Sequence, residues 1–292
     1  MVARVELALW RRGIWIRNLP RRPLYRRVGT FGLPSTISSL RVGEYPRRFA
    51  VPPEKVVTPF GFGFGSHGWH PYIHTLNQID NEGTVPYEQS ALARFYTRYQ
   101  PTSLADALAV RPEEACEELR GLPSAWPILR DIWLMGPSDL AAACRRAHAT
   151  TLTQRNAHIG PMSDEGGRRH YERLIDVYAS LRQHGYDPLR FDYQHANYPG
   201  QGEANGYFLW DGADYRFVVL HGHHRLAAAA HLREAVLHVC IRRRYIPVIE
   251  LDRLSARAFA PWASTALAQL LFSRLFTSDG AQKCREWRLM DL

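Results

Sequence analysis

Lysine and cysteine are both scarce in this chain of 292 residues. Lysine and arginine together number 37, and only Lys55 and Lys283 are lysines. The four cysteines lie far apart in the sequence and form no CxxC pair, so neither a disulfide framework nor a zinc ribbon is expected. Because 46% of the residues are hydrophobic, we expect a sizeable core. The cysteines are expected to be reduced thiols buried in that core.

Several signals of location and function are also missing. No run of about 20 apolar residues occurs, so no transmembrane helix is expected. The first residues interrupt a short apolar stretch with arginines, unlike a signal peptide, and the protein is expected in the cytosol. A Rossmann cofactor site is not expected, and the absence of GxxxxGK[ST] and GxSxG excludes a P-loop and an α/β-hydrolase nucleophile.

The excess positive charge is concentrated at the start of the chain. Residues 1–50 contain eleven arginines, with Glu6 and Glu44 as their only acids, so this segment alone accounts for the formal net charge of +9. Tryptophan and tyrosine lie among these arginines, a composition that suits a nucleic acid, an anionic membrane surface or an acidic partner. A solvated arm packed on its own domain is the alternative interpretation.

Residue patterns divide the chain into three predicted regions. Residues 1–150 are expected to be basic and aromatic-rich, with short strands and irregular structure first and helices between 88 and 149. In that helical part, Leu92, Phe95, Tyr96 and Tyr99 share one predicted helical stripe, and Ser103 with Asp106 has the pattern of a capping box. Residues 151–255 show a helical stripe, a β-hairpin around Asp211-Gly212, a turn, a second helix and another strand. This order predicts a small α/β (α+β) domain with a mixed sheet. Residues 256–292 are expected to form closing helices.

The segment VVLHGHHRLAAAAHL, residues 218–232, concentrates cationic and titratable groups at one predicted strand-to-helix turn. A glycine there lets the backbone approach a ligand, and the first amides of the helix attract anions. His223, His224 and Arg225 add donors beside Gly222, and a guanidinium suits a pair of phosphate oxygens. These residues predict a phosphate-binding turn, with a purely structural cap as the alternative.

The same residues resemble the phosphate-binding motif of the ParB/sulfiredoxin superfamily. The resemblance covers roughly residues 151–250 and includes the upstream stretch YASLRQHGY, which is similar to a helix that precedes the hairpin in that superfamily. It implies that a nucleotide phosphate is held at the turn, with Gly222 in the backbone role and His224 and Arg225 as donors. His223 occupies the variable position. Residues 1–150 resemble no family that we recognise.

Departures from that superfamily narrow the implied activity. Reduction of a sulfinic acid needs a cysteine thiolate where this chain has His223, so sulfiredoxin chemistry is not expected. Too few residues follow Asp252 for the DNA reader and dimerisation tail of a chromosome-partitioning clamp. The remaining hypothesis is a kinase-like phosphotransferase that uses ATP, ADP or CTP with Mg²⁺ on a small-molecule or sugar-like hydroxyl acceptor. Asp164 or Glu165 would position that hydroxyl, unless both only cap the following helix.

Three rival hypotheses stay open. The chain is alternatively a nucleotide-gated DNA-binding protein whose basic arm contacts the duplex, or a ParB-like nuclease. It is alternatively a metal-dependent enzyme, because imidazole is a common ligand of transition metals. The histidines that would contribute to such a metal site are His67, His70 and His74 in the loop GFGFGSHGWHPYIH together with His221, His223 and His224. The first hypothesis instead interprets this loop as a cover over the ligand pocket.

Overall fold

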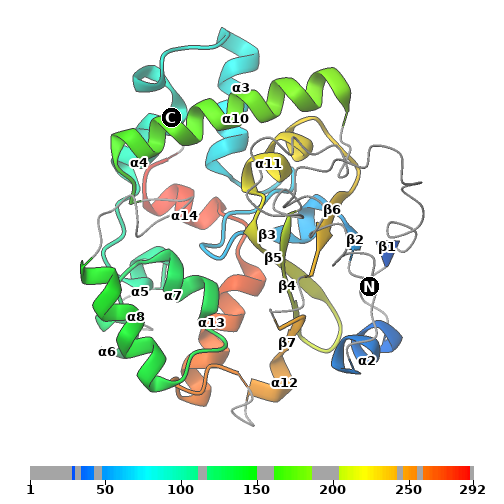
Figure 1. The fold of residues 1–292 in the computed structure, drawn as a ribbon, viewed down its shortest axis with the longest axis vertical. Coiled ribbons are helices and arrows are strands. Elements are labelled where there is room, and N and C mark those ends of the chain that lie inside the picture. The colour runs from blue at the N-terminus through cyan, green and yellow to red at the C-terminus, as the bar shows by residue number, and fades with distance from the viewer. Residues whose placement is uncertain are drawn as a thin grey trace, which may run out of the picture.

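The fold is an α/β arrangement in which helices surround one mixed sheet (Figure 1). The computed structural model describes residues 28–29, 34–42, 48–110, 117–149, 161–185, 204–241, 246–254 and 259–289. Most of the predicted basic arm, residues 1–50, lies outside these residues, as does Cys116. The prediction of an α/β fold with a mixed sheet is confirmed.

Within the described residues, seven strands form the sheet. Their order is β1-β2-β6-β4-β5-β3, and β7 also pairs with β4. The strands are β1 Val28–Gly29, β2 Arg48–Val51, β3 Val56–Val57, β4 Asn205–Trp210, β5 Tyr215–His221, β6 Leu237–Cys240 and β7 Val248–Glu250.

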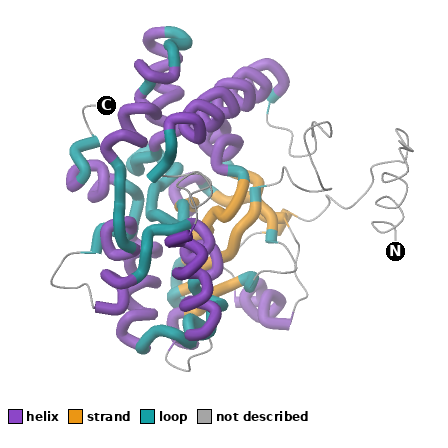
Figure 2. Tube along the Cα trace, turned by 60° about the vertical axis from the view of Figure 1, so that its left-hand side comes forward, coloured by secondary structure: helices purple, strands orange, loops and turns teal. Residues whose placement is uncertain are grey.

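Helices account for most of the other described structure. The longer ones are α2 Pro34–Val42, α3 Pro71–Glu82, α4 Ala91–Arg98, α8 Pro137–Ala149, α10 Asp164–His184, α11 His223–His231 and α13 Thr265–Thr277. The short ones are α5 Leu104–Ala107, α6 Glu117–Gly121, α7 Trp126–Asp131, α12 Leu251–Leu254 and α14 Ala281–Glu286, with 3-10 turns at Pro53–Lys55 and Tyr87–Gln89. Most of them gather on one side of the strands (Figure 2).

The sheet combines strands from both sides of the boundary predicted near residue 150. The hairpin β4–β5 is antiparallel, and β3 adds to β5 in parallel, with Val56 opposite Phe217. Strand β2 pairs antiparallel with β6, with Phe49 opposite Val239. One hydrophobic cluster also extends through all three predicted regions. Residues 48–57 therefore complete the sheet of the C-terminal half.

Helices α3, α10 and α11 pack against one another at the end of the sheet where β5 leads into α11 (Figure 1). Their contact is fixed at the far end of α11 by a polar cluster around Asp80 of α3. The Tyr178 hydroxyl donates to Asp80 Oδ1 at 2.6 Å, and His231 Nε2 lies 2.8 Å from Asp80 Oδ2. Both hydrogen bonds lower the pKa of Asp80. Because Tyr178 lies on α10 and His231 on α11, the Asp80 carboxylate joins three helices.

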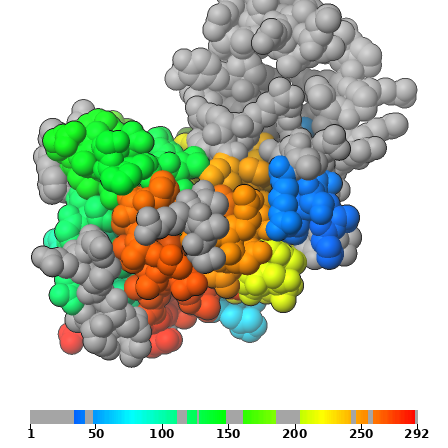
Figure 3. Space-filling view, turned by 90° about the horizontal axis from the view of Figure 1, so that it is seen from below, coloured from blue at the N-terminus to red at the C-terminus, as the bar shows by residue number. Residues whose placement is uncertain are grey.

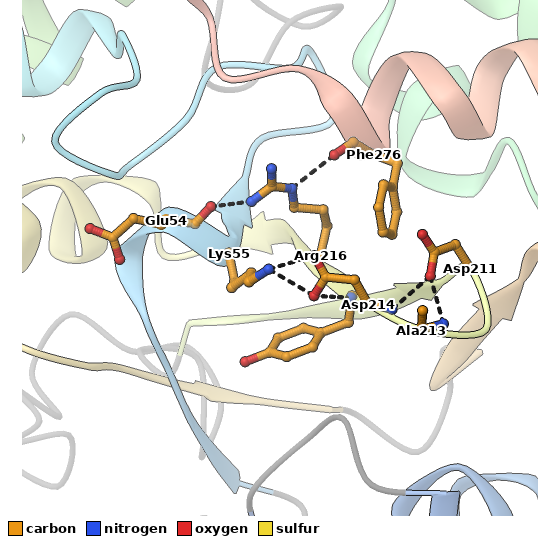
Figure 4. A network of polar contacts seen from close by, with 8 residues as sticks. Glu54, Lys55, Asp211, Ala213, Asp214, Arg216 and Phe276 are labelled. Carbon is orange, nitrogen blue, oxygen red and sulfur yellow. Dashed lines mark hydrogen bonds and ion pairs between the residues drawn. The ribbon is translucent and has the colours of Figure 1, made fainter.

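The β4–β5 hairpin is held by a second polar network (Figure 4). Asp211 Oδ1 accepts the amides of Ala213 and Asp214 at 2.8 Å and 2.7 Å, which closes the turn. Lys55 Nζ donates to Asp214 Oδ1 at 2.7 Å, and the Arg216 guanidinium donates to the carbonyls of Phe276 and Glu54. These bonds anchor β5, and with it the turn that follows, to the 3-10 turn Pro53–Lys55 and to α13.

Helix α2 packs beside β7 and α12, at the right of Figure 3. The Arg41 guanidinium donates to both carboxylate oxygens of Glu250, which is fully buried, and Arg253 donates to Glu250 at 3.2 Å. The arginines lower the pKa of Glu250 against the opposing effect of burial. The interaction links the start of the described chain to the sheet.

Many local predictions are confirmed. Helix α4 buries the predicted stripe Leu92, Phe95 and Tyr96, and α10 ends at Gly185, whose φ of 72° is positive but whose ψ of 173° lies outside the left-handed helical region. The capping box of Ser103 and Asp106 is present. No disulfide joins the described cysteines, Cys144, Cys240 and Cys284, and the last two are buried. No helix among the described residues is long and apolar enough to cross a membrane.

Candidate functional site

The predicted phosphate-binding turn has the expected backbone. Strand β5 ends at His221, Gly222 adopts the left-handed conformation with φ 95° and ψ 16°, and α11 begins at His223. The Gly222 carbonyl accepts the amide of Leu226 at 3.0 Å, which is the first hydrogen bond of the helix. In every α-helix, the amides of the first turn lack a hydrogen-bond acceptor within the helix itself. In α11 these amides lie directly after the buried strand β5.

Two features require glycine at position 222, namely its positive φ and its close approach to another part of the protein's own chain. A Cβ atom on Gly222 would lie 2.6 Å from the Cα of Ala204, a distance that real side chains do not adopt. We expected a ligand to lie close to the backbone of this glycine. In the structure the space is filled by the residue that precedes β4.

His223 is fully buried at the start of α11. Burial lowers its pKa well below the ordinary value, and the neighbouring His70, His224 and His221 lower it further. The ring is therefore neutral at physiological pH. The ring of His223 lies inside the protein, although we expected it to line the ligand.

His224 is half-buried and contacts two aromatic side chains that sequence analysis did not single out. Its ring stacks on Tyr72 of α3, with centroids 4.6 Å apart and planes 17° from parallel. Its Nε2 atom lies 3.1 Å from Nδ1 of His170 on α10. Arg225 follows at the third position of α11 and is also half-buried. The turn thus brings together α3, α10 and α11.

His70 caps α3 from the other side of this cluster. Its Nδ1 atom accepts the amide of Tyr72 at 3.1 Å, so the neutral ring carries its proton on Nε2. Nε2 is buried and, within the part of the chain that the structure describes, has no hydrogen-bond partner. Burial lowers the pKa of His70 to about 3. His70 and His223 are both neutral and close enough for the charge of one to affect the other.

The other loop histidines do not join this cluster. His67 is exposed, and the His74 ring packs against Trp69 in a tilted arrangement, with centroids 5.9 Å apart and planes 33° from parallel. No group of three or more histidine, cysteine, aspartate or glutamate side chains in the described ranges could hold a metal ion. The predicted histidine metal site therefore has no support from the described residues.

The glycine-aromatic loop before α3 packs on the C-terminal helices. Residues 63–68, between β3 and α3, do have the spacing GxGxxG, so a Rossmann site cannot be rejected for lack of that motif. The amides of Gly63 and Trp69 donate to the carbonyl of Asp279 at 3.0 Å and 2.8 Å. A Cβ on Gly63 would lie 2.8 Å from the same carbonyl.

The close approaches in this loop are thus made to the segment between α13 and α14. A dinucleotide fingerprint uses its glycines to approach a pyrophosphate, and these glycines approach protein backbone instead. The contacts agree with the rejection of a Rossmann site. The interpretation of the loop as a cover over a ligand pocket stays a prediction.

Asp164 and Glu165 lie in the first turn of α10, directly after the N-cap Ser163. Both side chains are exposed, and Glu165 accepts a hydrogen bond from Arg169 at 3.0 Å. The Ser163 hydroxyl accepts the amide of Gly166 at 3.2 Å. This arrangement has every feature of a capped, acidic helix start, which was the structural alternative to a catalytic role. His170 lies further along the same helix, at the turn.

No protein-family model matches the chain, and searches of curated proteins and of solved structures found no match. The arguments for function therefore rest on the site itself. The resemblance to the ParB/sulfiredoxin superfamily stays a hypothesis.

Proposed function

We propose that this protein is a nucleotide-binding, kinase-like phosphotransferase that holds phosphates at the turn of Gly222 to Arg225. One observation carries the proposal: β5 enters α11 through a left-handed glycine, so the amide end of a helix lies at the end of a central strand. Helix amides and the helix dipole favour anions at that position. Arg225 adds a guanidinium, which forms paired hydrogen bonds with phosphate oxygens.

The surroundings of the turn support binding of an anion. The helix is held at its start by the stacking of Tyr72 on His224 and at its end by the Asp80 cluster, so its amides are fixed before a ligand arrives. His224 and His170 are nitrogen donors next to the helix start. The acceptor is proposed to be a small-molecule or sugar-like hydroxyl, and the reaction to occur in the cytosol.

Magnesium would accompany ATP, ADP or CTP in such a reaction, but the described residues at the turn do not fit a magnesium site. Magnesium prefers oxygen ligands, and the side chains gathered here are imidazoles and a tyrosine. The side chains described at the turn therefore offer no magnesium ligands. Asp164 or Glu165 would position the acceptor hydroxyl, and their exposed place on α10 leaves them open to solvent.

Calorimetric titration tests the proposal. ATP, ADP, CTP and GTP, each with magnesium, are titrated into the wild-type protein and into Arg225→Ala. Loss of one charged hydrogen-bond donor should weaken binding about 10- to 100-fold. Arg146→Ala is the matched control, because Arg146 is an exposed arginine on α8, away from the turn. Failure of all four nucleotides to bind, or equal binding by both variants, would overturn the proposal.

The DNA-binding and nuclease alternatives depend on residues 1–50, most of which lie outside the described residues. They stay predictions with a direct test. Duplex binding that falls steeply as salt rises, and that disappears when residues 1–27 are deleted, would favour a DNA-binding protein. Metal-dependent cleavage of the duplex would favour a nuclease.

A further inference from the structure

His170 and His224 approach each other ring to ring at the proposed ligand turn. Nδ1 of His170 lies 3.1 Å from Nε2 of His224, the ring centroids are 5.1 Å apart, and the planes differ by 12°. A centroid separation this much longer than the nitrogen contact means that the two nearly parallel rings approach through their edges, without face-to-face overlap. That is the geometry of an N–H···N hydrogen bond between two imidazoles.

Such a contact limits how many protons the two rings can carry. In the neutral pair, one facing nitrogen bears a proton and the other offers its lone pair. A third proton on the pair can be held at an outer nitrogen, which turns the contact into a stronger, charge-assisted hydrogen bond. A fourth would place N–H groups on both facing nitrogens at 3.1 Å, and the hydrogen bond would be lost. The pair therefore takes up one proton and resists a second.

The neighbouring residues favour protonation of this pair over protonation of His70 or His223. Burial keeps His70 neutral by lowering its pKa to about 3, and it lowers the pKa of His223 as well. The Tyr72 ring lies flat against His224, and an aromatic face stabilises a cation placed over it. Tyr72 of α3 contacts the pair, and His70 and Tyr96 contact Tyr72. The titratable and charged side chains within three positions of either ring along the chain are Arg168, Arg169, Tyr171, Glu172, Arg173, His221, His223 and Arg225.

We propose that binding of a phosphate-bearing ligand at the turn is coupled to the uptake of one proton by the His170–His224 pair. The ligand's negative charge next to the pair favours the imidazolium, and the N–H···N contact sets the upper limit at a single proton. The proton comes from the solvent, and no covalent bond changes. His224 is the ring beside the helix start, and His170 is the positioning residue that shares its charge. This inference rests on the proposed phosphate-binding function.

Proton-linked calorimetry tests it directly. The nucleotide that binds in the titrations above is titrated with magnesium between pH 7 and 8.5, in two buffers that differ in protonation enthalpy. The dependence of the apparent enthalpy on the buffer gives the number of protons taken up per ligand. For the wild-type protein we expect a value that rises as the pH falls and does not exceed one.

Variants of His170 separate the shared contact from the count of histidines. His170→Phe removes the hydrogen-bond partner of His224, so proton uptake should fall by at least half. His170→Gln keeps an acceptor oxygen and should retain the uptake. His184→Phe is the matched control, since His184 is exposed at the far end of the same helix. We expect wild-type uptake in this control.

The outcomes are distinguishable. No binding by the wild-type protein would overturn the proposed function and this inference together. Binding without proton uptake, uptake of two protons, or unchanged uptake in a folded His170→Phe would overturn only the inference. The upper limit of one proton is measured on the wild-type protein, so the test stands even if His170→Phe does not fold.

Discussion

The buried ammonium of Lys283 donates a hydrogen bond to the backbone carbonyl of Ala107, which joins α14 to the end of α5. The same carbonyl accepts the Tyr99 hydroxyl at 3.0 Å. Lys283 is 2% exposed, and its Nζ atom lies 5.6 Å from the centroid of the Phe62 ring. Burial without a carboxylate partner among the groups that hold it lowers the pKa of Lys283 to about 7. One of the chain's two lysines is thus a core residue.

This burial predicts a stability that rises with pH. Between about pH 7 and the ordinary lysine value of 10.5, the unfolded chain binds a proton that the folded protein does not. Stability increases with pH wherever the unfolded state holds more protons. The free energy of unfolding, measured by urea denaturation, should therefore increase from pH 7 to pH 9. Lys283→Met should lack this increase and should be about 1 to 3 kcal/mol more stable than the wild-type protein at pH 6.

Lys55→Met is the control for that experiment. Lys55 is partly exposed and paired with Asp214 across 2.7 Å, so its replacement removes an ion pair and no buried charge. We expect it to keep the wild-type rise in stability between pH 7 and pH 9. A flat wild-type profile over this range would contradict the assignment of Lys283 as a buried, partly neutral amine.

Gly222→Ala should destabilise the protein more than a left-handed backbone alone requires. Alanine at φ 95° costs about 1 to 2 kcal/mol, and its Cβ would also lie 2.6 Å from the Ala204 Cα. Gly212→Ala separates the two effects, because Gly212 has φ 104° and no atom within 4 Å of an added Cβ. We expect the Gly222 variant to lose about 1 to 3 kcal/mol more than the Gly212 variant in denaturant unfolding. Equal losses would show that Ala204 moves aside at little cost.

Local signals allowed much of the fold to be predicted. The buried stripe of α4, the capping box at Ser103 and the hairpin turn at Asp211 all depend on residues within a few positions of one another. Periodicity and turn chemistry encode such contacts directly. The residues that were named for the phosphate-binding turn also belong to that category, since strand, glycine and helix are consecutive.

The partners of the turn could not be predicted in the same way. His170 and His224 are 54 positions apart, and nothing in the spacing of either residue indicates the other. Their contact depends on how α10 crosses α11, which the packing of whole helices decides. The same holds for β2, whose pairing with β6 joins distant parts of the chain. The domain boundary near residue 150 followed from composition, which carries no information about such pairings.

Tyr178→Phe should loosen the junction of α3, α10 and α11. The variant loses the 2.6 Å hydrogen bond to Asp80 and should be about 1 to 2 kcal/mol less stable at pH 7. The Tyr178 hydrogen bond is a principal cause of the lowered pKa of Asp80, so its stabilising effect is present above the unfolded value of 3.8 and is lost as the pH falls below it.

The deficit of the variant should therefore shrink in acid. Urea unfolding at pH 7 and at pH 3 measures the change, and Tyr171→Phe is the control because the Tyr171 hydroxyl donates to the backbone carbonyl of Val85, which does not titrate. A deficit for Tyr178→Phe that stays constant across this range would contradict the role of the Asp80 carboxylate.

Substitution of Asp164 and Glu165, at the start of α10, distinguishes a catalytic role of these acids from a capping role. If the proposed phosphotransferase uses them, the double variant Asp164→Asn, Glu165→Gln should transfer phosphate at least about 100-fold more slowly. Nucleotide binding should change only a few-fold, because the phosphates are held at α11. Capping alone predicts a different result: a loss of about 0.3 to 1 kcal/mol in unfolding free energy with the transfer rate unchanged.

Ser163→Ala completes this comparison. It removes the 3.2 Å bond to the Gly166 amide and should cost about 1 kcal/mol of stability without touching either carboxylate. If Ser163→Ala and the double variant slow transfer equally, the acids act only by ordering the helix. If the double variant alone slows transfer while both variants bind nucleotide normally, a carboxylate on α10 must act on the acceptor hydroxyl itself.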